Sequence, residues 1–206
     1  MSNRAAVFIG LYFLIAPSLV LPSAGDYFIS KNVIEFKNSL YETYGQDSQK
    51  VVLRAKKGYL NLNNQDLKLI GKIKGTFTFG EETFSLKTES LNGNLKDKSI
   101  SSKEKTVFRT YDLEVVSNSM EIFQTQQEEI RILFRNGEVN KINSSSRINK
   151  GKANKIEIFL AEDLLIMKGN VEFYEENSKI ISDEIQYDLD TDRILKSLNA
   201  KIINNL

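Results

Sequence analysis

The sequence contains no histidine and no cysteine, and these two absences exclude several kinds of chemistry. Histidine is the usual acid–base residue near neutral pH, and both residue types are common zinc ligands. Without them the chain has no thiol nucleophile, no disulfide and no base for a serine triad. Gly-rich phosphate loops and dinucleotide-binding motifs are also missing. We therefore expect a protein that is not an enzyme and has no catalytic residues, no metal site and no cofactor.

Proline is scarce as well. Pro17 and Pro22 are the only two prolines, and both lie close to the N-terminus. Because a β-ladder uses the N–H group of each residue and proline has none, a proline-free body is compatible with one long, continuous sheet.

An excess of charge of either sign is also lacking, since 28 basic residues face 27 acidic ones. A nucleic-acid-binding protein is expected to carry a positive total or a basic stripe, so we expect no nucleic-acid partner. The length of 206 residues and the hydrophobic fraction of 41% indicate one domain with a substantial core.

One acidic cluster has the spacing of a calcium loop. Asp188, Asp190 and Asp192 stand at positions 1, 3 and 5 of such a loop, but Arg193 replaces the glycine of position 6 and Asn199 the glutamate of position 12. The cluster therefore predicts a polar turn between two strands.

The N-terminus begins with an apolar run, Ala5–Leu21. It has the length of a signal-peptide core, with Ser23 and Gly25 at the −3 and −1 positions of a cleavage site. It also reaches the short end of the roughly 17 to 25 residues that span a bilayer. Under both interpretations the rest of the chain is exported, and residues 5–21 are either cleaved off or kept as a membrane anchor.

From Asp26 onward, short runs of alternating apolar residues are separated by clusters of Asn, Gly, Asp, Lys and Ser. This period of two residues is typical of strands with one buried face. The alternation is visible at Leu67, Leu69 and Ile73; at Phe77 and Phe79; at Phe84 and Leu86; at Ile130, Ile132 and Phe134; at Ile156, Ile158 and Leu160; and at Val171 and Phe173. The pattern predicts an all-β sandwich, barrel or jelly roll.

A strand–turn–strand unit is repeated. In Lys179–Leu195 and in Ser85–Ser101 the apolar residues occupy equivalent positions, and Val52–Lys68 resembles a third copy. Repeats of this kind usually stack and bury one shared face.

Two longer segments resemble the repeated unit of a known family. They are LKLIGKIKGTFTFGEETFSLKTESLNGNLKDKSISS, residues 67–102, and LLIMKGNVEFYEENSKIISDEIQYDLDTDRIL, residues 164–195. Each has a strand containing GKI or GNV, a hairpin, a stretch with outward-facing polar residues such as SDEIQYDL, and a turn. In this respect the chain resembles the OstA-like family of periplasmic lipopolysaccharide-transport proteins, LptC first and LptA next, from about Val51 to Leu206.

The resemblance implies an open, V-shaped antiparallel β-jelly roll, built of repeated hairpins and preceded by an N-terminal apolar helix. The corresponding domains are 1–25 as signal peptide or anchor, 26–50 as linker and first strand, and 51–206 as the jelly roll. It also implies that lipopolysaccharide moves along an apolar groove between the sheets. The groove residues we expect are Leu69, Ile73, Phe77, Phe84, Leu86, Phe134, Val171 and Phe173.

Two alternatives to this LptC-like role stay open. One is an LptA-like soluble bridge protein, and the other is a structural β-solenoid or assembly scaffold with a dry core. The apolar residues alone do not separate a groove from an ordinary core.

The partners implied by the family are lipopolysaccharide and other Lpt proteins, namely the inner-membrane transporter and neighbouring jelly-roll units. The C-terminus offers a strand for such pairing, because it alternates apolar residues and carries one charge. We expect the partner strand to comprise Ala200, Lys201, Ile202, Ile203 and Asn204.

Overall fold

The computed structural model describes residues 27–30, 32–44, 50–79, 82–94, 96–97, 99–124, 130–142, 150–175 and 177–204. The predicted N-terminal helix and the apolar run Ala5–Leu21 lie outside these residues. Within the described ranges, no helix is long and apolar enough to cross a membrane.

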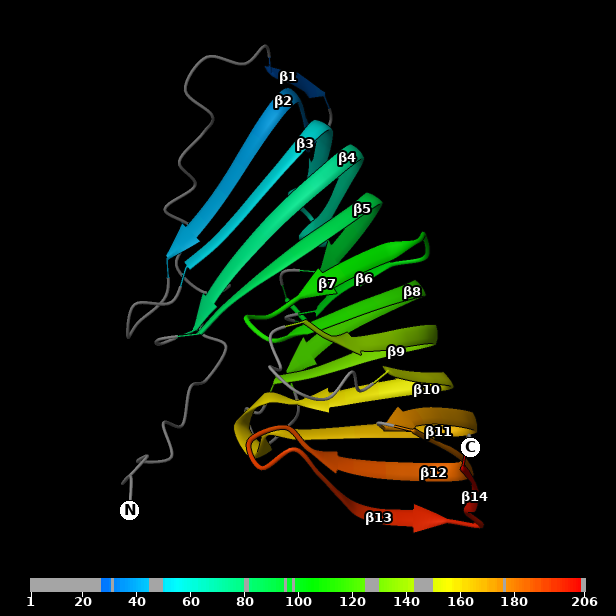
Figure 1. The fold of residues 1–206 in the computed structure, drawn as a ribbon. Helices are drawn as coiled ribbons and strands as arrows, with labels where there is room; N and C mark the ends of the chain where they lie inside the picture. The colour runs from blue at the N-terminus through cyan, green and yellow to red at the C-terminus, as the bar shows by residue number, and fades with distance from the viewer. Residues whose placement is uncertain are drawn as a thin grey trace.

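The described chain is almost entirely β-strand (Figure 1). The strands are β1 (Tyr27–Ser30), β2 (Val33–Tyr44), β3 (Lys50–Asn61), β4 (Asp66–Phe79), β5 (Glu82–Asn94), β6 (Ser99–Ser102), β7 (Thr106–Arg109), β8 (Leu113–Gln124), β9 (Ile130–Lys141), β10 (Lys150–Phe159), β11 (Leu164–Glu175), β12 (Ser178–Asp188), β13 (Arg193–Leu198) and β14 (Lys201–Asn204). A short 3₁₀ helix, η2 (Leu160–Glu162), connects β10 and β11.

All fourteen strands belong to one antiparallel sheet in which neighbours in sequence are mostly neighbours in space. The order is β1-β2-β3-β4-β5-β6-β8-β9-β10-β11-β12-β13, with β7 between β5 and β8, and with β14 on β12. The predicted all-β antiparallel fold is confirmed. The span 26–50 contains β1 and β2, which are part of the same sheet as the rest.

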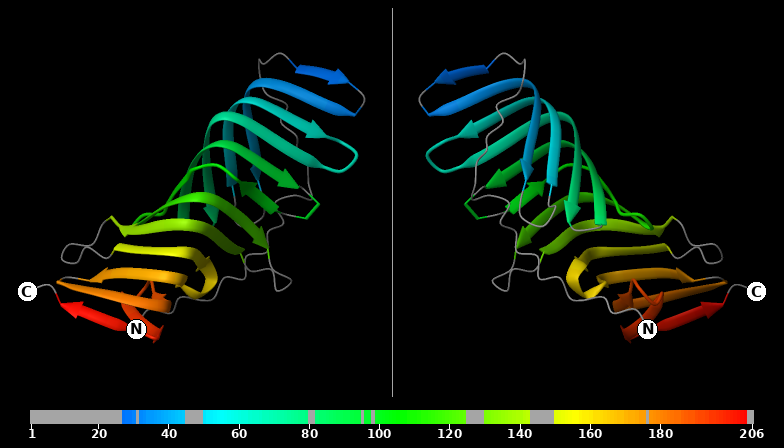
Figure 2. Two further views of the ribbon diagram at one scale, coloured as in Figure 1. Left: turned by 90° about the vertical axis from the view of Figure 1, so that its right-hand side faces the viewer. Right: turned by 90° about the vertical axis from the view of Figure 1, so that its left-hand side faces the viewer.

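The long strands bend near their middle, so that the sheet arches over its own inner face (Figure 2). In β4 the bend coincides with a register shift between Ile70 and Ile73, and Gly71 and Lys72 have positive φ angles of 87° and 49°. In β11 the same role falls to Gly169 and Asn170, with φ of 75° and 50°. Bulges with left-handed residues are a standard way to bend a strand sharply.

Residues on both sides of the bend point to the same interior. In β4, Leu69 before the bend and Ile73 and Phe77 after it are all at most 3% exposed. Small side chains line the inner side of several bends, among them Ala55, Ser117, Gly137 and Ala153, which are all buried. Room is limited at Gly137, where an added Cβ would lie 3.2 Å from Ile156 and 3.3 Å from Ser117.

The repeat seen in the sequence is a repeat in the structure. Leu86 and Leu91 of β5 are buried, as are the equivalent Ile180 and Ile185 of β12. Each pair belongs to a hairpin that adds one rung to the arch, β5–β6 in the first case and β12–β13 in the second. The predicted stacking of hairpins on one shared apolar face is therefore confirmed.

Candidate functional site: an apolar interior

All eight residues predicted to line the groove point to the interior. They come from β4, β5, β9 and β11, and each is at most 3% exposed: Leu69, Ile73, Phe77, Phe84, Leu86, Phe134, Val171 and Phe173. Outward residues next to them on the same strands are more accessible, for example Thr83, which is exposed, and Glu172, whose side chain is 40% exposed. The structure thus places the predicted set on the inner face; contact with lipid remains a prediction.

Aromatic rings connect the middle of this interior. Phe77 of β4 lies opposite Phe84 of β5, and the Phe84 ring stacks on Phe108 with centroids 5.8 Å apart. Phe108 then contacts Phe134 at 5.5 Å. The sequence interpretation missed Phe108, because β7 has four residues, too few for alternation to be evident.

A second aromatic contact lies nearer the C-terminus, where Phe173 and Tyr187 are 5.5 Å apart. Phe173 also faces Ile180 across the ladder, and Val171 faces Ser182. Tyr187 was not among the predicted groove residues. Its polar neighbours in the sequence conceal that it is only 4% exposed.

One cross-strand row runs through the whole interior, and we call it the inner row. Each member lies directly opposite the next on the neighbouring strand: Tyr41, Leu53, Gly75, Leu86, Phe108, Val115, Val139, Gly151, Phe173, Ile180 and Ile202. No member carries a charge. Ten steps between adjacent strands make a length of about 48 Å. The inner row is therefore a continuous apolar path from one edge of the sheet to the other.

The two ends of the inner row are less covered than its middle. Ile202 in β14 is 64% exposed, whereas Leu53, Leu86 and Phe108 are each 1% exposed. At the other end Tyr41 is partly buried, and this burial raises the pKa of its hydroxyl. The apolar interior consequently reaches the surface at the C-terminal edge.

A small hydroxyl cluster interrupts the apolar lining near the bend. The hydroxyls of Thr88 and Ser102 are 2.8 Å apart, and Thr106 donates to the Glu104 carbonyl at 2.9 Å and to Thr88 at 3.4 Å. These groups satisfy one another, so their burial needs no external ligand. The described side chains of the inner row include no carboxylate and no amine.

The acidic cluster at residues 188–192 forms a turn, as its residues predicted. The Asp188 carboxylate accepts hydrogen bonds from the backbone N–H groups of Thr191 at 2.8 Å and Asp190 at 3.0 Å. The Thr191 bond is the main reason that the pKa of Asp188 is lowered. Asp192 instead pairs with Lys141. Among the described residues, no group of acidic side chains is arranged to hold a metal ion.

The predicted partner strand forms the last edge of the sheet. Lys201–Asn204 pair with Ile181–Ser178 of β12, and β13 pairs with the other half of the same strand. The four side chains of β14 are exposed. One side of β14 is thus occupied by its own chain, and no strand in the described part of the molecule pairs with its other side.

Two family comparisons match the sequence, and each covers more than half of it. Residues 23–133 match the family described as "Lipopolysaccharide-assembly, LptC-related". Residues 87–193 match the family described as "LptA/(LptD N-terminal domain) LPS transport protein". The two matches overlap at the centre of the sheet, where β5–β9 lie. No curated protein matches the sequence significantly.

A solved structure shares the fold. The crystal structure of LptH, the LptA-homologous periplasmic component of the lipopolysaccharide transport device from Pseudomonas aeruginosa, superposes with a TM-score of 0.51 at 10% identity. The match covers 58% of this chain and 93% of LptH. Together with an arched sheet that encloses one apolar row, the matches show that the chain belongs to the OstA-like family of lipopolysaccharide-transport proteins.

Proposed function

We propose that this protein conveys lipopolysaccharide from the inner to the outer membrane, with the acyl chains inside the arch and the sugars in water. The observation that supports this most is the inner row, which stays apolar from Tyr41 to Ile202. Burying acyl chains there removes apolar surface from water, at about 0.8 kcal/mol per CH₂ group. Because the row is uniform along its length, a chain can shift from one rung to the next without meeting a charge.

The sequence favours an LptC-like role. The LptC-related match begins at residue 23, directly after the apolar run Ala5–Leu21. We infer that residues 1–25 export the protein and that, when retained, residues 5–21 anchor it in the inner membrane. The domain then works in the periplasm. An LptA-like soluble bridge protein results if the leader is cleaved after Gly25.

The edges of the sheet fit pairing with other Lpt proteins. Exposed N–H and C=O groups of an edge strand bind a further strand by β-augmentation. Along β14, the side that faces away from β12 is such an edge. At the opposite end, β1 pairs only with Val33–Phe36, and no other described strand pairs with the outer side of β2. We infer that both edges continue the sheet into neighbouring units.

Photo-crosslinking tests the interior path with matched neighbours. A photoreactive residue at Phe84 or Phe173 should crosslink to lipopolysaccharide in cells, because both positions face the interior. Thr83 and Glu172 adjoin them on the same strands but face outward. They should give little product, although lipopolysaccharide concentration and reagent access are the same.

Equal yields at all four positions would mean that inside and outside are misassigned or that lipid binds elsewhere. Crosslinks confined to Thr83 and Glu172 would also contradict the proposal. Western blotting of the crosslinked product with an antibody against lipopolysaccharide gives the readout.

The close packing of the interior favours a second candidate, a scaffold with a dry core. Leu69, Phe134 and Val171 are each 0% exposed, so no side of these residues is in water. A carrier must therefore separate the two arms of its arch to admit lipid, whereas a scaffold never does. Absence of a crosslink at both Phe84 and Phe173, with the protein folded and exported, would favour the scaffold.

The partner strand is tested best by adding charge to the edge. Because β14 also pairs with β12, proline at this position would disturb the protein's own sheet as well. Ile202→Lys is milder, since Ile202 is already 64% exposed, and an edge lysine disfavours strand addition. We expect weaker association with the next Lpt protein and an unchanged Tm. Association equal to wild type would exclude this edge, and Lys201→Gln serves as the control.

A further inference from the structure

A second cross-strand row runs along the outer face, one residue displaced from the inner row; we call it the outer row. In the N-terminal half it contains Arg54, Lys74 and Lys87, which lie directly opposite one another on β3, β4 and β5. Val107 and Val116 continue it across β7 and β8. In the C-terminal half it contains Glu138, Lys152 and Glu172 on β9, β10 and β11.

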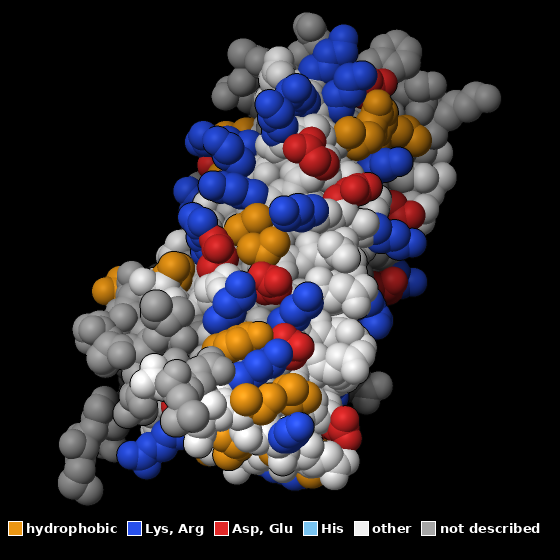
Figure 3. Space-filling view, turned by 45° about the vertical axis from the view of Figure 1, so that its right-hand side comes forward, with side chains coloured by type: hydrophobic (Ala, Val, Ile, Leu, Met, Phe, Trp, Pro, Cys, Tyr) orange, Lys and Arg blue, Asp and Glu red, His pale blue; other side chains and the backbone are white. Residues whose placement is uncertain are grey.

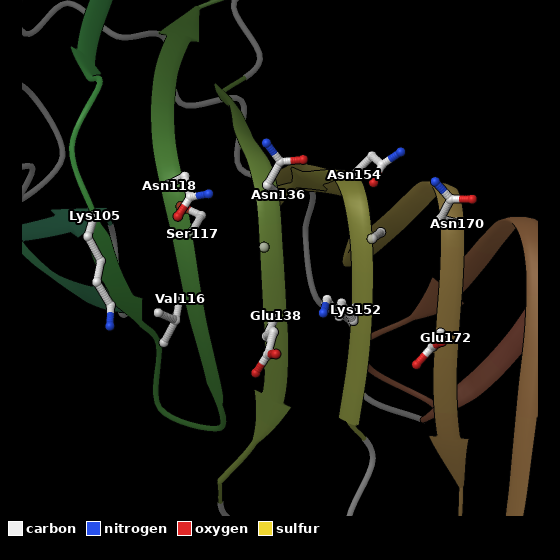
Figure 4. Close-up of a pocket in the computed structure, with 12 residues that line it drawn as sticks. Lys105, Val116, Ser117, Asn118, Asn136, Glu138, Lys152, Asn154, Asn170 and Glu172 are labelled. Carbon is white, nitrogen blue, oxygen red and sulfur yellow. The ribbon is translucent and has the colours of Figure 1, made fainter.

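In the C-terminal half the charges of the outer row alternate in sign. Val116, Glu138, Lys152 and Glu172 lie side by side beneath a row of asparagines, and they line a hollow of about 710 Å³ (Figure 4). Both acids are also paired along the surface, Glu172 with Lys179 at 3.1 Å and Glu138 with Lys150 at 3.5 Å. Opposite charges on directly facing residues stabilise a sheet.

In the N-terminal half the charges of the outer row have the same sign. The side chains of Arg54, Lys74 and Lys87 are all exposed, and none forms an ion pair in the described part of the chain. Like charges on directly facing residues destabilise a sheet. This arrangement therefore costs stability in the isolated protein, and a bound anion would remove that cost.

More cations surround the three. Lys37 lies directly opposite Lys57 on the outer face, and Lys56 and Lys72 are exposed at the bend. The nearby Glu89 has a carboxylate oxygen that accepts a hydrogen bond from the backbone N–H of Lys72 at 3.2 Å. In the space-filling view, Lys and Arg side chains gather over the upper part of the molecule, where β2–β5 lie, with some Asp and Glu side chains between them (Figure 3). These strands therefore carry a local excess of positive charge, although the chain as a whole is nearly neutral.

We propose that this basic patch, comprising Lys37, Arg54, Lys56, Lys57, Lys72, Lys74 and Lys87, docks on an anionic lipid surface. Its cations are exposed on four adjacent strands and on both sides of the bend, which suits an extended surface better than a small ligand. Each Lys or Arg close to an anionic membrane surface contributes about 1 kcal/mol to binding. Docking would hold the arch against the membrane from which its cargo comes.

The connection to the N-terminal apolar run is consistent with this partner. That run ends at Leu21, and β1 begins at Tyr27, so residues 22–26 separate them. Five residues span at most about 18 Å when extended. An anchored leader would therefore keep β1–β5, and with them the basic patch, near the bilayer. The patch lies on the outer face, so the proposal does not depend on lipid transport through the interior.

The absence of cysteine makes a site-specific test simple. The full-length Thr76→Cys variant carries one fluorophore beside Lys74 on the outer face, and the Asn154→Cys variant carries it in the C-terminal half. Both variants are reconstituted into two kinds of vesicle, phosphatidylcholine alone and phosphatidylcholine with phosphatidylglycerol. Both kinds of vesicle also contain a lipid whose headgroup carries a quencher. We expect quenching at residue 76 only in the anionic vesicles, and none at residue 154.

Two charge variants then decide the cause. In Arg54→Gln/Lys74→Gln/Lys87→Gln we expect the quenching at residue 76 to disappear, because the docking constant falls roughly a hundredfold. The control Lys96→Gln/Lys103→Gln/Lys196→Gln loses the same net charge from exposed positions outside the patch and should keep it. Lipopolysaccharide crosslinks at Phe84 and Phe173 should persist in both variants, which separates this test from that of the interior path.

Three results would overturn the proposal. Equal quenching in neutral and anionic vesicles would show that the leader alone positions the label. If the control variant loses as much quenching at residue 76, the net charge of the protein and not the patch explains the effect. If inositol hexakisphosphate binds the protein through Arg54, Lys74 and Lys87 while the vesicle label stays unquenched, the partner is a soluble polyanion and not a membrane.

Discussion

The two halves of the sheet have similar apolar inner faces, but the charges on their outer faces are arranged differently. The inner row is apolar on both sides of the centre, from Leu53 and Leu86 to Phe173 and Ile180. The outer row next to it has like charges in β3–β5 and alternating charges in β9–β11. Since the same register serves both rows, the difference arises from side-chain choice and not from the backbone. The interior is therefore apolar along its whole length. On the outer face, the cross-strand charges are favourable in the C-terminal half and unfavourable in the N-terminal half.

The largest effects should test the equivalence of the inner faces. Phe84→Ala in the N-terminal half and Phe173→Ala in the C-terminal half each remove a ring that is at most 3% exposed. We expect each to lower the free energy of unfolding by about 3–5 kcal/mol, through lost burial and the cavity that remains. Urea denaturation measures both. A large loss at one position with almost none at the other would show that the interior is not one core.

The bends should differ by a smaller amount. Lys72 and Asn170 both have left-handed backbone, with φ of 49° and 50°, but asparagine tolerates it better than lysine. Lys72→Gly should therefore raise stability by about 1 kcal/mol, and Asn170→Gly should change it by only a few tenths. Lys72→Gln keeps the strain and removes the charge. If Lys72→Gln stabilises as much as Lys72→Gly, charge rather than backbone strain explains the gain.

Single charge reversals should have opposite signs in the two halves. Lys74→Glu turns the N-terminal row into an alternating one and should stabilise the protein by roughly 0.2–1 kcal/mol. Lys152→Glu places three acids opposite one another and should destabilise it by a similar amount. Both differences should shrink at 1 M salt, where the screening length is about 3 Å. Thermal melts that shift in the same direction for both variants would contradict the charge pattern derived from the register.

The smallest effect should appear as a pH dependence confined to the C-terminal half. The hydrogen bond from Lys179, then that from Tyr174, holds the pKa of Glu172 below its usual value. A carboxyl with a lowered pKa adds stability above its unfolded pKa, and this contribution is lost as the pH falls through the folded value. Glu172→Gln should thus be less stable than wild type at pH 7, and the gap should close under acid conditions. A gap that is constant from neutral to acid pH, or one unaffected by Lys179→Gln, would rule out this cause.

Alternation in the sequence was sufficient to predict the long strands that carry the expected groove residues, and the face on which those residues lie. Leu69, Phe84, Phe134 and Phe173 point inward because a period of two places every second residue on the same side. The same pattern does not tell which residue on the next strand lies opposite. The outer row joins residues as distant in sequence as Arg54 and Glu172, and it becomes evident only when the register is known.

Short strands and buried polar residues could not be predicted from the alternation of apolar residues. Ser99–Ser102 shows no apolar alternation, yet it forms β6 between β5 and β8, and Ser102 is 1% exposed. Its hydroxyl is buried because Thr88, far away in sequence, provides the hydrogen-bond partner. The pairing of β14 with β12 was likewise not evident, since Ala200–Asn204 has the composition of a free edge.

The most direct test of the central claim is mass spectrometry of the lipid that copurifies with the full-length protein in a mild detergent. From the inner row, Tyr41 to Ile202, we predict that bound lipopolysaccharide survives purification, because the acyl chains of the lipid are shielded between the arms of the arch. A folded, exported protein that carries no lipopolysaccharide, from cells in which that lipid is abundant, would contradict the account and identify the interior as a dry core.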